Sequence, residues 1–171
     1  SNWLIPSDCV DLEIPQFGQF QKPVLENNQW VIKPDYRSAK VYNKQTKEII
    51  NKQLGEDLSE NETFTPPPEI DYSTNPLYKQ VRWNNDLNNW EIYDDENVAR
   101  DLFNQERSKR LSETDWLILR HQDELTRNIQ TTLTNDQYQQ LLEYRQALRD
   151  LPEQLGFNVF NPQWPEKPNF I

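Results

Sequence analysis

The sequence has few of the side chains that most often carry chemistry: one histidine, one cysteine and three glycines among 171 residues. A zinc site takes several nitrogen or sulfur ligands, and Cys9 and His121 alone cannot supply them. As a nucleophile and its base, these two residues would need positioning by the fold, and neither lies in a recognisable motif. Gly18, Gly55 and Gly156 are too dispersed to form a phosphate-binding loop. The sequence therefore predicts no catalytic residues, no metal site and no cofactor.

Carboxylates are abundant, yet their positions do not indicate catalysis. Two acidic runs, residues 94–96 and 123–124, bring carboxylates together in the sequence. A glycosidase needs two carboxylates at a defined separation across the scissile bond, and adjacency does not define one. We interpret the first run as a helix start, where acids complement the helix dipole, and the second as a solvated helix face. The oxygen-rich stretch 84–89 lacks the spacing of a calcium-binding loop and is typical of a hairpin turn.

Positive charge and long apolar runs are also scarce. The 18 Lys and Arg residues against 28 Asp and Glu give a net charge of -10, which repels phosphate backbones and anionic lipid headgroups. No apolar run approaches the ~20 residues of a membrane-spanning helix, and no signal peptide is recognisable. The single cysteine excludes an internal disulfide framework and fits a reducing compartment. We therefore expect no nucleic-acid partner and no membrane insertion.

Proline is absent from one long stretch, since none falls between Leu77 and Leu151. Because proline interrupts helices, we expect long helices in this gap and short strands with turns before it. Six Trp, seven Tyr and seven Phe supply the large rings that let so polar a chain fold. The predicted fold class is α+β. A β-rich module of short antiparallel hairpins, residues 1–93, precedes a helical module with an extended aromatic tail, residues 94–171.

Three stretches of the first module predict strand–turn–strand units. "KPVLENNQWVIKP" places apolar residues on both sides of Asn27-Asn28, a pair that tolerates the left-handed backbone of a tight turn. "AKVYNKQTKEII" turns near residues 43–47, and "KQVRWNNDLNNWEIYDD" is typical of a second tryptophan-bearing hairpin. Residues 66–68, all proline, predict an extended segment outside any sheet. The two Asn-Asn hairpins resemble each other, and internal duplication or independent use of similar turns both remain open.

Helical periodicity begins near residue 94. Asp94 or Asp95 is placed to cap a helix with apolar residues spaced by three and four. "SETD", residues 112–115, and "TNDQ", residues 134–137, have the pattern of capping boxes and predict two further helix starts. The apolar positions of the first helix are Val98, Ala99, Leu102 and Phe103.

The two later helices differ in the faces that we expect them to bury. In the middle helix, we expect Arg120 and residues 122–124 to be solvent-exposed and His121 to contact Leu117 or Leu125. The last helix should end before Pro152. Its apolar stripe consists of Tyr138, Leu141, Leu142 and Leu148, with Arg145 close by.

Aromatic residues are the remaining sign of a binding function. Trp and Tyr dominate protein-binding hot spots and also stack on sugars, whereas small sheets use the same rings as core. We expect a mixture of both roles. The aromatic tail after Gly156 should pack on its own domain or on a partner. The predicted partner-binding residues are Trp30, Tyr36, Tyr42, Trp83 and Trp90.

An ordered set of segments resembles the tail fibre assembly proteins of tailed bacteriophages and prophages. The first is Asp35-Tyr36-Arg37 followed by Val41-Tyr42, the "TKE" turn at residues 46–48, Leu54-Gly55 and the Thr65 to Pro67 element. "VRWNNDLNNWEIYDD" is similar to the strand pair that follows in that family. "SETDWLILRHQDEL", "TTLTNDQYQQLLEYRQALRDLPEQ" and "WPEKP" resemble the helical part of these proteins and of phage tail assembly chaperones. The family's turn usually has glycine where Lys47 stands, which predicts a different turn here.

The resemblance implies a non-enzymatic chaperone for virion assembly. Its partner would be the C-terminal, distal end of a tail fibre protein, whose folding and trimerisation it assists in the host cytoplasm. Some such proteins stay on the virion fibre tip, where host recognition takes place. A second copy of the chain is a further expected partner. The alternative hypothesis is a receptor-binding tip module that recognises host surface glycan through exposed Trp and Tyr faces.

Overall fold

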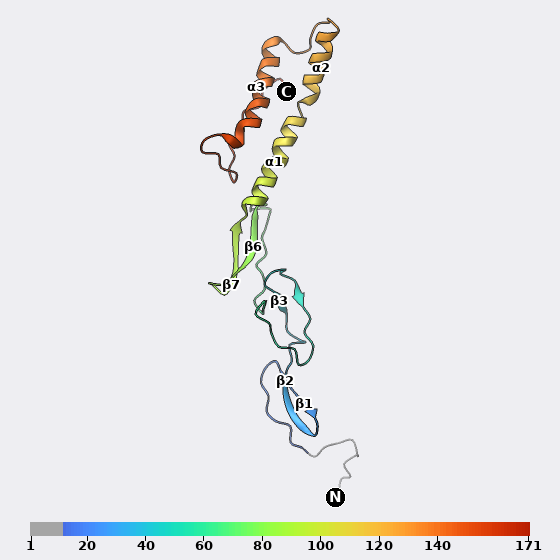
Figure 1. Cartoon of the computed structure of the whole chain (residues 1–171), viewed down its shortest axis with the longest axis vertical. Helices are drawn as coiled ribbons and strands as arrows, with labels where there is room; N and C mark the ends of the chain where they lie inside the picture. Colours follow the sequence, from blue (N-terminus) through green and yellow to red (C-terminus); the bar gives the residue numbers. More distant parts are fainter. Residues whose placement is uncertain (1–11) are drawn as a thin grey trace. The chain divides into compact units, whose positions relative to one another are not determined.

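The computed structural model describes residues 12–171 and has the predicted α+β organisation, with strands first and helices after them (Figure 1). Cys9 lies outside the described residues, so the structure does not test whether Cys9 and His121 could act as a nucleophile and its base. The strands are β1 (Gln21–Glu26), β2 (Gln29–Pro34), β3 (Val41–Asn43), β4 (Ile49–Ile50), β5 (Glu62–Thr63), β6 (Lys79–Asn84) and β7 (Asn89–Asp94). The helices are α1 (Glu96–Ser112), α2 (Asp115–Thr126), α3 (Asn135–Asp150) and the 3-10 turn η1 (Leu151–Glu153).

The described chain forms two compact units. The first contains the residues up to Glu69 together with Val81–Ile92, and the second contains Ile70–Gln80 together with Tyr93–Ile171. The segment 70–80 therefore packs with the helices rather than with the strands that precede it. The division into modules at residue 93 remains a prediction.

The two predicted tryptophan-bearing hairpins are confirmed. β1 and β2 form a two-stranded antiparallel sheet in which Glu26 lies opposite Gln29. The turn residues Asn27 and Asn28 have φ values of 49° and 60°, the left-handed conformation that asparagine tolerates. β6 and β7 form a second two-stranded sheet, and Asn88 in its turn has a φ of 45°. Asparagine-rich turns thus set the register of both hairpins.

The predicted turn at residues 43–47 joins β3 to β4, and β3 lies at the centre of a three-stranded sheet with β5 on its other side. Lys47 has a φ of 67°, so it takes the left-handed conformation that glycine takes most readily. The expectation that this turn differs from the family's turn stays a prediction. The Asn43 carboxamide explains how the turn holds, because it accepts hydrogen bonds from the N–H groups of Gln45 and Thr46 at 2.7 and 3.0 Å.

Two of the three helix starts form as the sequence predicts. Asp95 caps α1 by accepting hydrogen bonds from the N–H groups of Asn97 and Val98 at 2.9 and 3.2 Å. Thr134 and Gln137 form a complete capping box at the start of α3. After α3, Leu151–Glu153 continues as a 3-10 turn, so the helix ends next to Pro152 as expected.

The capping box predicted at residues 112–115 is wrong. Ser112 is the last residue of α1, and Thr114 stands at the N-cap of α2 without a side-chain capping bond. The Thr114 hydroxyl is engaged elsewhere, because it donates to the Leu111 carbonyl at 2.8 Å and accepts a hydrogen bond from Arg145. A tertiary contact from α3 thus replaces the local cap that the four-residue pattern suggests.

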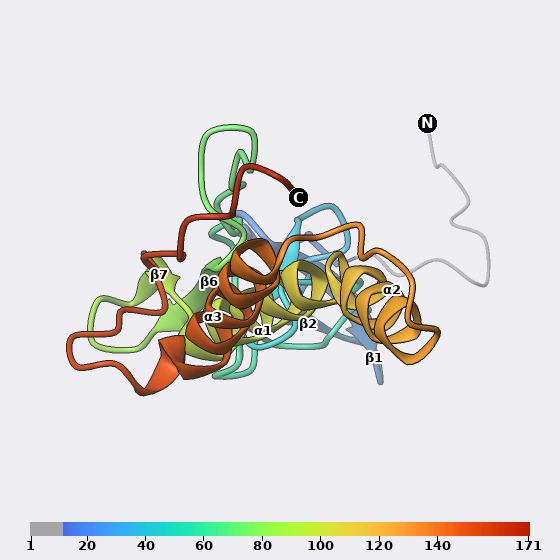
Figure 2. The ribbon, with the colours of Figure 1, turned by 90° about the horizontal axis from the view of Figure 1, so that it is seen from above.

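Arg145 joins α3 to the junction of α1 and α2. Its guanidinium donates to the Leu111 carbonyl at 2.7 Å, to the Thr114 hydroxyl and to the Asp115 carboxylate at 2.7 Å. Only 9% of Arg145 is exposed, so these bonds lie largely away from water. Figure 2 shows α3 running beside α1 within this unit. The charged residue expected beside the apolar stripe is therefore part of the buried face.

The helices bury a small apolar core that the end of the chain completes. Leu117, Leu133 and Leu141 form the centre of this core, and Phe170 and Ile171 pack against it. His121 is 2% exposed and stacks on Tyr138, with ring centroids 3.8 Å apart. The predicted contact of the aromatic tail with its own domain is thus confirmed, and His121 lies in the interior of the helical unit.

Two exposure predictions fail on α2 and α3. Glu124 is buried, although we expect it on a solvated face, and Leu142 is exposed, although we expect it in the stripe. Glu124 is buried because its carboxylate accepts hydrogen bonds from the N–H and the hydroxyl of Thr132 at 2.7 and 2.6 Å and from Arg120 at 2.9 Å. This carboxylate therefore anchors the connection between α2 and α3.

Replacing Arg145 with methionine should lower the free energy of unfolding by about 2–4 kcal/mol. The variant leaves the Leu111 carbonyl and Thr114 without their buried donor, and unsatisfied buried groups cost about 1–3 kcal/mol each. Urea unfolding measures the change. Arg149→Met on the exposed face of α3 is the control, with an expected change within ~0.5 kcal/mol. An equal effect of both substitutions would contradict the structural role of Arg145.

Glu124→Gln should remove a pH-dependent part of the stability. Hydrogen bonds from the Thr132 side chain and N–H, with Arg120 beside them, lower the pKa of Glu124 to about 2. A carboxyl with a lowered pKa stabilises the fold above its ordinary pKa of 4.5, and this contribution is lost as the pH falls from there towards 2. Between pH 7 and pH 3, the melting temperature of Glu124→Gln should fall less steeply than that of the unmodified chain. Asp123→Asn, which removes a neighbouring exposed carboxylate, should keep the steeper dependence.

Candidate partner-binding surfaces

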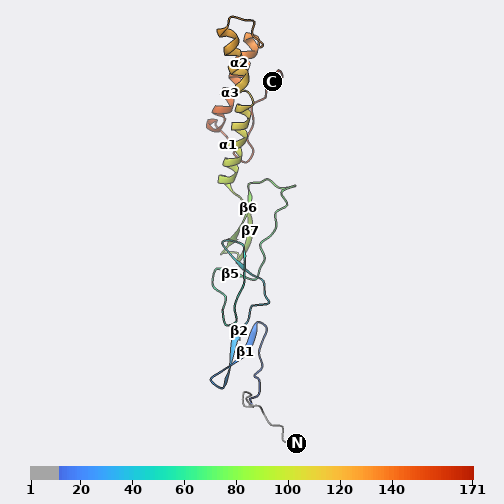
Figure 3. The ribbon, with the colours of Figure 1, turned by 90° about the vertical axis from the view of Figure 1, so that its right-hand side faces the viewer.

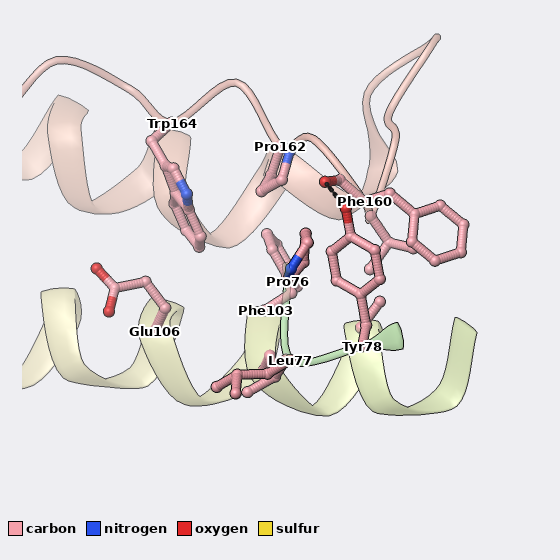
Figure 4. A pocket seen from close by; sticks show the side chains of 11 residues that line it. Pro76, Leu77, Tyr78, Phe103, Glu106, Phe160, Pro162 and Trp164 are labelled. Atoms are coloured by element: carbon pink, nitrogen blue, oxygen red, sulfur yellow. Dashed lines mark hydrogen bonds between the residues drawn. The ribbon is translucent and has the colours of Figure 1, made fainter. Parts of the chain in front are cut away.

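The helical unit contains an apolar groove between α1, the segment before β6 and the C-terminal tail. It encloses about 270 Å³, and apart from Glu106 its lining is apolar or aromatic. Figure 4 shows Trp164 and Pro162 of the tail on one side, with Phe103 and Leu77 facing them. Such a groove suits an apolar side chain of another polypeptide better than a charged or highly polar ligand.

Aromatic contacts hold the walls of this groove. The Phe103 ring stacks on Trp164 at 5.0 Å and meets Phe157 edge-on at 4.9 Å. The guanidinium of Arg110 lies 4.6 Å from the centre of the Trp164 ring, a cation–π contact that holds the tail on α1. Phe103 lies on the buried side of α1, as its helical spacing predicts. The same ring provides the surface on which the tail packs.

Tyr78, the residue before the first residue of β6, forms part of the opposite wall of the groove. Its hydroxyl donates to the Phe160 carbonyl at 3.4 Å, and the two rings meet at 5.1 Å (Figure 4). Leu77, the residue before it, is 56% exposed even though it lines the groove. Leu77 thus exposes an apolar side chain at the mouth of an apolar groove, a feature that is typical of interaction surfaces.

A second hollow lies on the outer surface of α2. Trp116 and Leu119 are largely exposed there, and Ile129 borders the same surface after the helix ends. The carbonyl of Glu124 accepts a hydrogen bond from the Ile129 N–H at 3.1 Å, which holds this part of the connection against the helix. The apolar residues of α2 therefore divide between a buried face and a face open to contact.

Two of the five predicted binding residues lie together in the first unit. Trp83 and Trp90 meet edge-on at 5.3 Å, and Lys44 lies 4.5 Å above the Trp83 ring. Trp90 is 8% exposed and donates from Nε1 to the Thr65 carbonyl at 2.9 Å, directly before the three prolines. The pair joins the second hairpin to the extended proline segment, which itself lies outside every sheet, as predicted.

The other three predicted residues have packing partners of their own. Tyr36 packs with Phe20 and Phe64 in a cluster whose ring centroids lie 5.3–5.6 Å apart. Tyr42 pairs with Ile49 and Thr63 across the three-stranded sheet, whereas Trp30 lies opposite Leu25 in the first hairpin. Tyr36, Tyr42 and Trp30 are half-buried, so each has a packed side and an accessible side. Their role in binding remains a prediction.

Sequence reasoning predicted that the tail packs on its own domain, but it missed the groove and the residues around Tyr78 that the tail meets there. The signal was present in part, because Leu77 and Pro76 interrupt a polar segment and Pro162 and Trp164 recur in the tail. Their meeting depends on a contact across about eighty residues, and no local periodicity encodes such a contact.

The described residues carry no cluster of three or more His, Cys, Asp or Glu side chains arranged to hold a metal ion. Over the same residues, no helix combines the length and the apolar character that crossing a bilayer requires.

Comparison with known proteins gives one family match. The model of the family described as phage tail assembly chaperone protein matches residues 101–169, which include most of α1, all of α2 and α3, and most of the tail. Comparisons with curated proteins and with solved structures find no match. Residues 101–169 of this chain are therefore similar to the phage tail assembly chaperone family.

Proposed function

We propose that this protein is a tail fibre assembly chaperone that binds the C-terminal, distal end of a phage fibre protein and assists its folding and trimerisation. The observation that carries the proposal is the family match over residues 101–169, which supports a role in tail assembly. The fibre as client rests on the ordered segments of the first module that resemble tail fibre assembly proteins. The protein acts without catalysis, in the host cytoplasm where virions assemble.

The surfaces of the helical unit fit this task. A fibre subunit exposes strand edges and apolar tips before its trimer closes, and such surfaces aggregate. Leu77 at the groove and Trp116 and Leu119 on α2 offer apolar side chains that can cover them. The net charge of -10 keeps a protein with such exposed residues dispersed, because like-charged molecules repel each other.

The mode of action follows from these contacts. Apolar contacts with a partly folded client are favourable while its own subunits have not yet covered the same surface. When the trimer closes, the other fibre subunits compete with the chaperone for the apolar surface of the client. Release or retention of the chaperone then depends on how much of this surface the closed trimer leaves exposed. A chaperone retained at the distal end becomes part of the fibre tip.

Co-expression with the fibre protein encoded beside this chain tests the proposed function. Trimer yield, measured by SDS-resistant bands and by size-exclusion chromatography with light scattering, should rise several-fold when the chain is present. The chain should also co-purify with the fibre. A fibre that trimerises equally well alone and never co-purifies with this chain would contradict the proposal. Specific sugar binding by the chain alone on a glycan array would favour a receptor-binding tip module instead.

Leu77→Glu should weaken fibre binding by about tenfold while leaving the fold intact. The substitution places a charge at the mouth of the apolar groove, and desolvating that charge opposes contact with an apolar client. Leu87→Glu in the β6–β7 turn is the matched control, because Leu87 is similarly exposed, 65% against 56% for Leu77, but does not line the groove. Calorimetric titration with the fibre fragment measures both variants. Equal affinities would exclude the groove as a contact.

A further inference from the structure

The first hairpin has a regular alternation of backbone groups that identifies its free edge. In an antiparallel pair, residues that exchange hydrogen bonds alternate with residues whose N–H and C=O point away from the partner strand. The two-residue Asn27-Asn28 turn makes Glu26 and Gln29 a hydrogen-bonded pair. Counting from the turn, the outward-pointing residues of β2 are Trp30, Ile32 and Pro34, and those of β1 are Gln21, Pro23 and Leu25.

Two hydrogen bonds beyond the ladder agree with this alternation. The Asp35 N–H donates to the Phe20 carbonyl at 2.7 Å, as the next bonded pair after Gln21 and Pro34 should. The Pro34 carbonyl accepts from the Gly55 N–H at 2.8 Å, so it points away from β1. The assignment of inward and outward groups is thus fixed at both ends of the hairpin.

The outer edge of β2 is open at Trp30 and Ile32. Within residues 12–171, no backbone hydrogen bond outside the hairpin uses the N–H or C=O of either residue. The outer edge of β1 differs, because Pro23 lies in its middle and has no N–H to offer. The hairpin therefore has one edge suited to a further strand and one edge that proline blocks (Figure 3 shows both strands).

In the other small sheets of the first unit, β3 and β6 have partners on the side away from their own hairpin. β3 is paired on both sides, by β4 and β5. In β6, the Val81 carbonyl accepts a hydrogen bond from the Lys47 ammonium group at 3.1 Å. Charged side chains of this kind are a common protection of strand edges against unwanted pairing.

The side chains of this hairpin also lack cover. Leu25, Val31 and Ile32 are each exposed by more than a third, on both faces of the ribbon. An isolated two-stranded ribbon is marginally stable in water, and a third strand supplies both the missing hydrogen bonds and apolar cover. A sugar cannot match the strand-spaced donors and acceptors of Trp30 and Ile32, whereas an extended polypeptide does.

We propose that the free edge of β2 receives an extended strand of the fibre protein, which becomes the third strand of this sheet. The partner segment is a β-strand with apolar side chains beside Ile32 and Val31 and with free backbone groups on one edge. This mode is strand addition, in which main-chain hydrogen bonds give affinity and side chains give selectivity. The inference rests on the proposed function, since it names how the same client is held.

Ile32→Pro tests the edge with little disturbance of the hairpin. The N–H that it removes points outward, and its cross-strand neighbour is already Pro23. We expect the dissociation constant for the C-terminal fragment of the fibre protein encoded beside this chain to rise at least tenfold. Leu25→Pro makes the same change on the blocked edge of β1 and should alter the constant less than twofold. Circular dichroism and melting temperature verify that both variants fold.

Amide hydrogen exchange provides a second test that uses the unmodified chain, so its result does not depend on whether a variant folds. The N–H groups of Trp30 and Ile32 should exchange rapidly in the free chain and at least a hundredfold more slowly in the complex. The N–H of Val31, which bonds within the hairpin, should be protected in both states.

The outcomes separate the two proposals. If the fibre fragment binds but neither amide slows and both proline variants bind alike, strand addition is wrong and the chaperone function stands. If the fragment does not bind the unmodified chain, the chaperone function fails and strand addition to the fibre fails with it. If sedimentation shows self-association that protects Trp30 and Ile32 without the fibre, a second copy occupies the edge and the proposed occupant is wrong.

Discussion

The helical unit depends on one guanidinium group in its interior. Arg145 satisfies the carbonyl at the end of α1, the hydroxyl at the start of α2 and a carboxylate one residue later. Because a planar guanidinium has five donors in a fixed arrangement, one side chain can hold three acceptors on two helices. The direction in which α2 leaves α1 is therefore set from α3, and the surfaces on either side follow from it.

The consequence is a unit that covers only part of its apolar surface. The tail seals one side of the helices through Phe170 and the contacts of Trp164 with Phe103 and Arg110. Trp116 and Leu119 remain open on α2 because the buried face of that helix is taken by Leu117, His121 and Glu124. A polar, acidic chain tolerates such exposure better than a neutral one, which connects the composition with the proposed chaperone role.

The first unit also leaves part of its surface uncovered, in its case both side chains and backbone groups of strands. Its sheets are too small to form a large core, so rings from separate strands and loops pack in local clusters such as Trp83 with Trp90. Lys47 has two roles in this unit. Its backbone takes the left-handed conformation of the turn, and its ammonium group donates a hydrogen bond to the Val81 carbonyl. In the first hairpin, the outward-pointing N–H and C=O groups of Trp30 and Ile32 form no backbone hydrogen bond within residues 12–171.

The sequence by itself determined the hairpins, the start of α1, both ends of α3 and the α+β order. These features rest on turn residues, caps and proline positions, all of which act within a few residues. The tertiary structure alone decided that Thr114 binds Arg145 instead of capping α2, that Glu124 is buried and that Leu77 meets the tail. Each of these depends on groups brought together from distant parts of the chain, and a charged side chain reads as exposed until its buried partners are known.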